Sequence, residues 1–415
     1  MSSPAAASAF ASISELLLLV AENLDRDTAL FAQLCRVNRR FNAIFSPFLY
    51  RACDIRTTGR MSGPRTCSHL AHTKSFSLRL PDNSGDFNLD DVASAPELIR
   101  KMPALETFEW AGQPLPHDAP QALKSCQNLK SVHITYPEEI EGDYFELAEC
   151  DWDVNEQGWK PGIDKYCSKK SLEYSRLFYA QDLSTLAGLE SLVLEHIYGN
   201  MHLWERHLVQ ILRNCPDLRK LGLSVARQAI VRCGGNGSWE MWGFLDRLCD
   251  AYSLSPGGSA PTTSLQLRSL GAGTGVYVTE ATSIDKLTNL SLLEEVELDV
   301  GNIWNGRGVE HYVFEVEETY VVNYELLLSP DACPNMRRIR LSHMGRRAFD
   351  NLKNLHRINQ DFLRRLVVEV DNNNWSEHWL KEWIDLTFPG TTPTGWVWKG
   401  KSLILYPMDT PSEDW

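Results

Sequence analysis

The residue types that most often carry chemistry occur in this sequence without the spacing that common catalytic sites require. Gly271, Gly273 and Gly275 form a short glycine-rich run, but neither the spacing of a phosphate-binding loop nor a following Lys-Ser/Thr pair is present. His69 and His72 would share a helix face, yet no acidic third ligand lies near them in the sequence. Neither a G-x-S-x-G nucleophile elbow nor an H-E-x-x-H metal motif occurs. We therefore expect a protein that is not an enzyme, without a catalytic, cofactor-binding or metal site.

Charge and cysteine content narrow the class of partner. The 415 residues include 41 Lys and Arg against 54 Asp and Glu, a net charge of -13, which disfavours nucleic acid and favours protein partners. Ten cysteines occur without a C-x-x-C pair, as is typical of free thiols in a reducing compartment, so we expect a cytoplasmic or nuclear protein. The longest apolar run considered, Leu16 to Ala21, is far shorter than the roughly 20 residues that span a bilayer, and no membrane association is predicted.

The first 56 residues predict a small helical domain that follows a flexible tail over residues 1–11. Ser12 and Glu15 fit a capping box at the start of a first helix, whose leucine-rich sequence is apolar on more than one side. Asp27 and Asn38 are good N-caps for a second and a third helix, and the third is expected to end at Ser46-Pro47. So short a segment cannot bury every apolar face internally, so one face requires another surface.

These residues resemble an F-box. The run ISELLLLVAENLDRDTALFAQLCRVNRRFNAIFSPFLYRA, residues 13–52, has the early E-L-L, the leucine-rich first helix, the L-C-R-V-N-R-R-F centre and the S-P-F-L-Y-R exit. Ser14 departs from the family, which usually has proline there. The resemblance implies docking on the Skp-family adaptor of a cullin-based ubiquitin ligase; a generic three-helix cap is the alternative. The implied adaptor-binding residues are Ile13, Leu16, Leu17, Val20, Leu34, Cys35 and Val37.

The rest of the chain, residues 57–415, repeats the pattern apolar-x-x-apolar-x-apolar. Strong copies begin at residues 105, 129, 189, 218, 267, 293, 336 and 363, and weaker copies lie near Phe76/Leu78 and Leu403/Leu405. Cys126, Cys215 and Cys333 each stand three residues before the first apolar position. Amphipathic helical stretches precede several copies. The chain therefore resembles an irregular leucine-rich-repeat solenoid, an α/β fold with a curved parallel sheet on the concave side and helices and loops on the convex side.

Two segments of this domain have an unusual composition. An acidic insertion at about residues 138–165 holds nine carboxylates and no Lys or Arg between Glu138 and Glu156. It predicts a mobile surface loop, or a docking site for a basic partner. At the end of the chain, Trp375, Trp379 and Trp383 recur at helical spacing, and Trp396 and Trp398 alternate as on a strand. We interpret them as a hydrophobic cap on an open solenoid end, with an aromatic ligand pocket as the alternative.

Charged residues lie between the apolar positions of three successive predicted strands. In a solenoid these intervening residues face outward on the concave sheet. Either the acidic and basic strands pair with each other, or the patch binds a charged segment of a client protein. The expected function is a non-catalytic substrate-recognition subunit of an SCF-type ubiquitin ligase, with a stand-alone interaction scaffold as the alternative. The candidate client-binding residues are Glu295, Glu297, Asp299, Arg338, Arg340 and Arg365.

Overall fold

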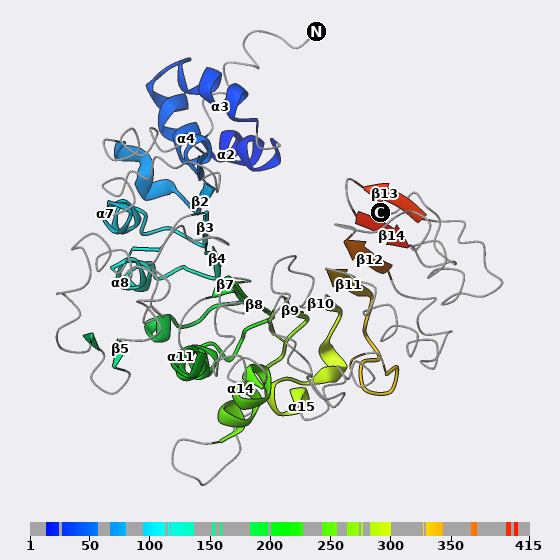
Figure 1. Ribbon diagram of the computed structural model, residues 1–415. Helices are drawn as coiled ribbons and strands as arrows, with labels where there is room; N and C mark the ends of the chain where they lie inside the picture. Colours follow the sequence, from blue (N-terminus) through cyan, green and yellow to red (C-terminus); the bar gives the residue numbers. More distant parts are fainter. Residues whose placement is uncertain are drawn as a thin grey trace, which may run out of the picture. The chain divides into compact units, whose positions relative to one another are not determined.

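The structure is a computed structural model. The chain forms two compact units, of which the first ends at Val132 and the second begins at His133. Figure 1 shows its helices and strands. The division falls within strand β4 (Ser131–Thr135). The described residues are 14–24, 27–56, 67–79, 94–112, 115–116, 118–136, 152–153, 158–159, 183–197, 201–226, 243–254, 264–273, 275–276, 283–299, 327, 329–342, 367–371, 396–399 and 402–405.

The first unit opens with three helices that are followed by parallel strands. The helices are α2 (Ser14–Asn23), α3 (Thr28–Cys35) and α4 (Arg39–Leu49). β1 (Ala52–Ile55), β2 (Ser75–Arg79) and β3 (Thr107–Ala111) pair in parallel in that order. The short helices α7 (Ala95–Arg100) and α8 (Ala119–Lys124) lie on one side of these strands, whereas η2 (Ser68–His72) is a 3-10 turn. Because β1 belongs to the sheet, the predicted boundary at 56/57 falls after the first strand rather than before it.

The second unit continues the same construction. β7 (Ser191–Ile197), β8 (Lys220–Val225), β9 (Ser269–Ala272), β10 (Glu295–Asp299), β11 (Arg338–Ser342) and β12 (Val367–Asp371) pair in parallel in that order. The helices α11 (Met201–Asn214), α14 (Phe244–Ser253) and α15 (Ile284–Leu287) lie together on one side of the strands (Figure 1). Two 3-10 turns, η4 (Leu183–Thr185) and η5 (Leu290–Leu292), precede β7 and β10. The protein is thus mixed α/β, and in neither unit do the described strands close into a barrel.

Two features of the second unit differ from a regular parallel repeat. β14 (Ser402–Leu405) and β13 (Trp396–Lys399) pair antiparallel beyond β12, so the copy at Leu403/Leu405 is a strand but not a further parallel repeat. Within the acidic insertion, β5 (Trp152–Asp153) and β6 (Gly158–Trp159) form a two-stranded antiparallel sheet. Trp396 does lie on a strand, as its alternation with Trp398 predicts. Trp375, Trp379 and Trp383 lie outside the described residues.

The apolar positions of the repeated pattern form the core beneath the sheet. Phe76, Phe108 and Trp110 are completely buried on their strands, with Phe108 stacked on both Phe76 and Trp110, and the corresponding positions of the strands from β4 to β10 are also buried. The predicted helical stripe of α11 is buried as well, from Trp204 to Leu212. Gly222 on β8 and Gly271 on β9 occupy outward positions of their strands. Gly271 therefore belongs to a strand rather than to a phosphate-binding loop.

A recurring hydrogen-bond pattern shows that the copies are structurally equivalent. Before seven of the described strands, the carbonyl of the preceding residue accepts hydrogen bonds from two successive N–H groups of the next copy. Glu294 N–H and Glu295 N–H, for example, both donate to the carbonyl of Arg268. Such a ladder aligns each strand start with its neighbour and fixes the register of the sheet. The accepting residues are Arg51, Lys74 and Glu106 in the first unit and Glu190, Arg219, Arg268 and Glu294 in the second.

The three repeat cysteines occupy one equivalent position. Each carbonyl accepts a hydrogen bond from the N–H three residues later, at Leu129, Leu218 and Met336, and Met102 and Leu290 take the same place in other copies. All three thiols are buried, and burial raises the pKa of each of them. The pKa of Cys333 is raised to about 11. A protonated thiol is a small hydrophobe, so these residues are packing groups of the turn rather than reactive sites.

Candidate functional site

The helices α2, α3 and α4 form a small module with its own apolar core. Leu17 and Ala21 of α2 are buried against Phe31 of α3 and Phe45 of α4. The centroid of the Phe45 ring lies 6.1 Å from that of Phe31. The side chains of Asp27 and Asn38 cap α3 and α4 by accepting backbone hydrogen bonds, as the sequence predicts.

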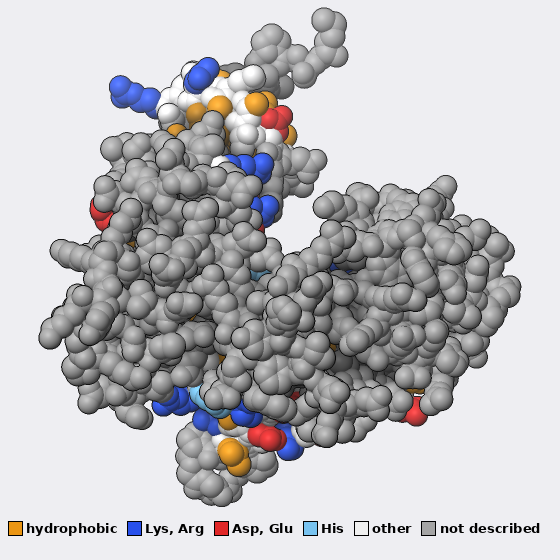
Figure 2. Space-filling view, in the orientation of Figure 1, with side chains coloured by type: hydrophobic (Ala, Val, Ile, Leu, Met, Phe, Trp, Pro, Cys, Tyr) orange, Lys and Arg blue, Asp and Glu red, His pale blue; other side chains and the backbone are white. Residues whose placement is uncertain are grey.

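The outer surface of this helical module retains large apolar side chains. Leu18 and Leu19 of α2 are 41% and 53% exposed, and Val37, in the turn between α3 and α4, is 60% exposed. Arg36 and Arg39 flank this turn and are exposed. Figure 2 shows apolar side chains among basic ones on the visible surface of the module. These exposed apolar side chains make the surface of the helical module a candidate site for contact with another protein.

The structure corrects one of the predicted adaptor-binding residues. Leu17 is only 3% exposed and belongs to the core of the module, because the helical phase turns it toward Ala21 and away from solvent. The exposed positions of the same helix are Leu18 and Leu19, which the predicted apolar stripe left out. Of the other predicted residues, Val37 is exposed, Ile13 lies outside the described residues, and Leu16, Val20, Leu34 and Cys35 are partly buried.

The predicted charged patch on the sheet of the second unit consists of pairs across neighbouring strands. Glu295 of β10 is in register with Arg338 of β11, and Glu297 with Arg340. The charged atoms are 3.8 Å apart in the first pair and 3.6 Å apart in the second. Each side chain remains 41–50% exposed, so the patch is both internally paired and accessible. Asp299 is the last residue of β10, and Arg365 lies outside the described residues.

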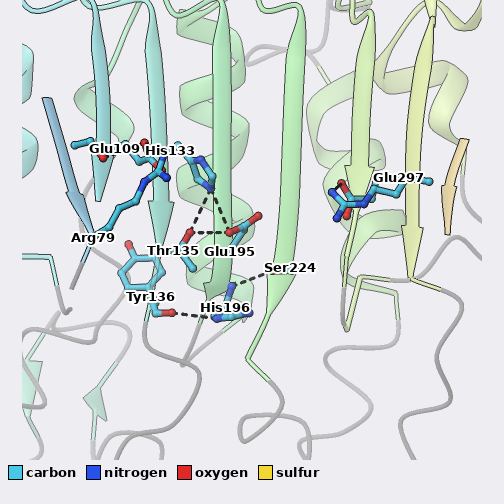
Figure 3. Close-up of polar contacts among 11 residues, drawn as sticks. Arg79, Glu109, His133, Thr135, Tyr136, Glu195, His196, Ser224 and Glu297 are labelled. Carbon is cyan, nitrogen blue, oxygen red and sulfur yellow. Dashed lines mark hydrogen bonds and ion pairs between the residues drawn. The ribbon is translucent and has the colours of Figure 1, made fainter. Parts of the chain in front are cut away.

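A second polar cluster lies on the same unit, and the sequence interpretation missed it (Figure 3). Glu195 Oε2 accepts a 2.6 Å hydrogen bond from Thr135 Oγ1 and lies 3.2 Å from His133 Nε2. His133 and Thr135 are outward positions of β4, and Glu195 follows the repeat position Leu194 on β7. The signal that predicts the charged patch, a polar residue between apolar strand positions, also occurs here.

The backbone beside this cluster has an unusual conformation. His196 is the one non-glycine residue of the described chain with positive φ, at 56°, where the register between β7 and β8 shifts. Its N–H donates to Ser224 Oγ at 2.9 Å, and its Nδ1 lies 3.1 Å from the carbonyl oxygen of Tyr136. These contacts hold a bulge next to Glu195, and beyond it Ile197 is in register with Val225 and is buried.

The environment of Glu195 keeps its carboxylate ionised. Burial raises the pKa of Glu195, but hydrogen bonds from His133 and Thr135 and the charge of nearby histidines outweigh burial and lower the pKa to about 2. The usual value is about 4.3. The side chain is nevertheless 41% exposed, so a permanently charged, oriented group faces solvent.

The depressed pKa of Glu195 predicts how stability depends on pH. Because the folded state holds the proton less tightly, the ionised group stabilises the fold above about pH 4.3, and this contribution is lost as the pH falls toward 2. The difference in free energy of unfolding between wild type and Glu195→Gln should therefore change as the pH falls from about 5 toward 2. Urea unfolding at a series of pH values measures this difference. A difference that is the same at low and neutral pH would contradict the assignment.

The described part of the chain contains neither a cluster of metal-ligating side chains nor a helix that could span a membrane. Within this part, His, Cys, Asp and Glu side chains form no group of three or more that could hold a metal ion. His69 stacks on Tyr50, with ring centroids 4.6 Å apart. No helix in the described segments is long and apolar enough to span a bilayer.

Comparison with known proteins does not assign a family. No known protein family matches this chain, and no curated protein is similar enough to be matched with it.

Proposed function

We propose that this chain is a non-catalytic substrate-recognition subunit of an SCF-type ubiquitin ligase. In this role the F-box-like helical module docks on a Skp-family adaptor, which joins it to a cullin, and the outward face of the leucine-rich-repeat-like sheet binds a protein client. Function then follows from proximity, because the client is held at high effective concentration near the ubiquitin-charged enzyme.

The observation that carries the proposal is the exposed apolar surface of the helical module. Leu18, Leu19 and Val37 lie outside a core that is already complete without them. Burying a leucine side chain against a partner contributes about 1.5–3 kcal/mol before the costs of association. The recurring carbonyl ladder supports the second half of the proposal, because equivalent repeats present a continuous row of outward side chains.

A stand-alone interaction scaffold is the second candidate, and Ser14 is the residue that favours it. Ser14 stands where the F-box family usually has proline. Its Oγ accepts a 2.8 Å hydrogen bond from Arg40, which ties the start of α2 to the start of α4. Ser14 therefore links two helices of the module to each other, and this role does not depend on binding an adaptor.

Charge placed on the exposed leucines tests the adaptor half of the proposal. Leu18→Asp plus Leu19→Asp should abolish co-purification with the Skp-family adaptor, because two carboxylates would have to be desolvated at the interface. The thermal unfolding transition should change little, since both side chains face solvent. Pull-down of the recombinant adaptor, with circular dichroism on the same samples, measures both.

Leu254→Asp is the matched control, because Leu254 is an exposed leucine of the second unit, at 69% exposure. It should co-purify with the adaptor as the wild type does. Substitution of Leu17 is unsuitable for this experiment, because that side chain is part of the core. Failure of the wild-type chain to bind any Skp-family protein would reject the ligase role and favour the scaffold.

A further inference from the structure

Glu195 differs from the other carboxylates on the outward face of the second unit in the partners that it has. Glu295 and Glu297 each face an arginine on the neighbouring strand. Glu195 has no lysine or arginine partner among the described residues; its partners are a threonine hydroxyl and the ring of His133. A histidine neutralises a carboxylate only while it is protonated. Among the described residues, Glu195 is therefore a carboxylate of this face without a permanent cation as its partner.

The carboxylate of Glu195 is also oriented with one oxygen available. Both of its hydrogen-bonding partners contact Oε2, and within the described segments none contacts Oε1. The two contacts fix the rotation of the carboxylate, so a cation that binds Oε1 does not need to order it first. Preorganisation of this kind reduces the cost of binding.

The surface next to Glu195 carries almost no side chains. Gly222 of β8, Gly271 of β9 and Gly273, the first residue after β9, form what we call the glycine floor. A Cβ atom added at Gly271 would lie 3.3 Å from Gly222 Cα, and one added at Gly273 would lie 2.8 Å from Ser224 Cβ. Close approach of the strands therefore excludes larger residues, and the result is a strip of bare backbone beside a fixed negative charge.

The neighbours of the glycine floor suit an aliphatic chain that ends in a cation. Val193, which is only 8% exposed, packs closest to Gly222, with Cγ1 3.1 Å from the position of an added Cβ, so the lining there is apolar. Lys220 is the basic residue of β8, but it stands four residues before Ser224, which separates them by about 13 Å along a strand. Its charge is therefore remote from the Glu195 end of the floor.

We propose that Glu195 and the glycine floor bind a lysine side chain of the client protein, an inference that rests on the proposed function. The ammonium group would donate to Glu195 Oε1, and the methylene stem would lie over the glycine floor. Lysine fits better than arginine, because a bidentate guanidinium would need both carboxylate oxygens and would displace His133 and Thr135 from Oε2. The net charge of -13 attracts such a basic segment at long range.

Synthetic peptides test this site on the purified full-length chain without the adaptor. The probes are short Gly/Ser peptides with a central lysine, arginine, acetyl-lysine or norleucine, and fluorescence anisotropy measures their binding at low salt. The lysine peptide should bind best, and acetyl-lysine and norleucine peptides should bind more weakly by up to about fivefold, the upper end of the range for an exposed ion pair. Added salt should weaken only the charged peptides.

Glu195→Gln should bring the lysine peptide down to the level of the norleucine peptide. Glu294→Gln is the matched control, because it removes a partly exposed carboxylate of the same unit that already has an arginine partner, Arg268 at 3.3 Å; it should leave lysine binding unchanged. Equal binding of lysine and acetyl-lysine peptides by the wild type, or full binding by Glu195→Gln, would overturn the proposal. A preference for arginine would overturn the choice of cation.

The same variants separate this inference from the adaptor proposal. Glu195→Gln should bind the Skp-family adaptor as the wild type does, and Leu18→Asp plus Leu19→Asp should bind the lysine peptide as the wild type does. If the wild type binds the lysine peptide but not the adaptor, the ligase role alone is rejected. Loss of lysine preference with adaptor binding intact rejects the Glu195 site alone.

Discussion

Replacing Arg247 by methionine should lower the free energy of unfolding of the second unit by about 3 kcal/mol. Arg247 of α14 forms an ion pair of 2.6 Å with Glu205 of α11, whose side chain is only 10% exposed. Methionine keeps much of the aliphatic length but removes the cation. Glu205 is then left largely buried, with His202 Nδ1 at 3.2 Å as its remaining side-chain partner among the described residues. Breaking a buried pair on one side is costly because the remaining charge stays desolvated.

Urea unfolding of the full chain measures this loss of free energy, and hydrogen exchange shows whether α11 and α14 are the helices that are destabilised. Lys286→Met is the matched control, since Lys286 also pairs with a residue of α14, Asp250 at 2.7 Å, but both side chains are exposed. Exposed pairs contribute little, so this control should unfold as the wild type does. If both variants lose the same free energy, the burial of Glu205 has no energetic consequence and the argument fails.

The sequence predicts the strands well because their periodicity is short and local. Phe108 and Trp110 alternate with polar residues and lie buried on β3, and the same pattern locates β2, β4, β7 and the later strands. Asp27 and Asn38 also act as the caps that their side chains predict. These features depend on residues no more than a few positions apart, so an amino-acid sequence states them directly.

Predictions that depend on tertiary packing were less accurate. The third helix was expected to end at Pro47, yet α4 continues to Leu49, and Tyr50 N–H still donates to the Ser46 carbonyl at 2.9 Å. Proline removes one hydrogen bond there, but Phe45 and Phe48 on the same helix pack on Phe31 and outweigh that loss. Leu17 was assigned to the wrong surface for a related reason, because four consecutive leucines do not state which one faces the core.

The Glu195 cluster was out of reach because its parts are distant in the sequence. Thr135 and Glu195 are 60 residues apart, and the acidic insertion lies between them. The outward position of each residue could be predicted from its own strand, but their hydrogen bond requires knowing that β4 and β7 are neighbours. The pairs on β10 and β11 were easier to propose as alternatives, since the two strands carry opposite charges at matching positions.

Replacing Phe45 by alanine should destabilise the helical module by about 3–4 kcal/mol. Phe45 is 1% exposed and packs between the rings of Phe31 and Phe41, with centroids 6.1 and 5.5 Å away. Truncation leaves a cavity where three helices meet, and so small a core has few other contacts to compensate. Hydrogen exchange of the amides of α2 to α4 should accelerate by a factor of about 100 or more, which mass spectrometry of the native protein measures.

Leu19→Ala is the control for Phe45→Ala, because it also truncates an apolar side chain of the module, but one that is 53% exposed. Exchange in α2 to α4 should be unchanged in this variant, whereas adaptor binding should weaken. Phe45→Ala should weaken adaptor binding only as far as the module unfolds, so cooling should restore part of it. The two variants thus distinguish core side chains, which stabilise the module, from surface side chains, which are proposed to contact the adaptor. Equal effects of the two variants on hydrogen exchange would contradict this distinction.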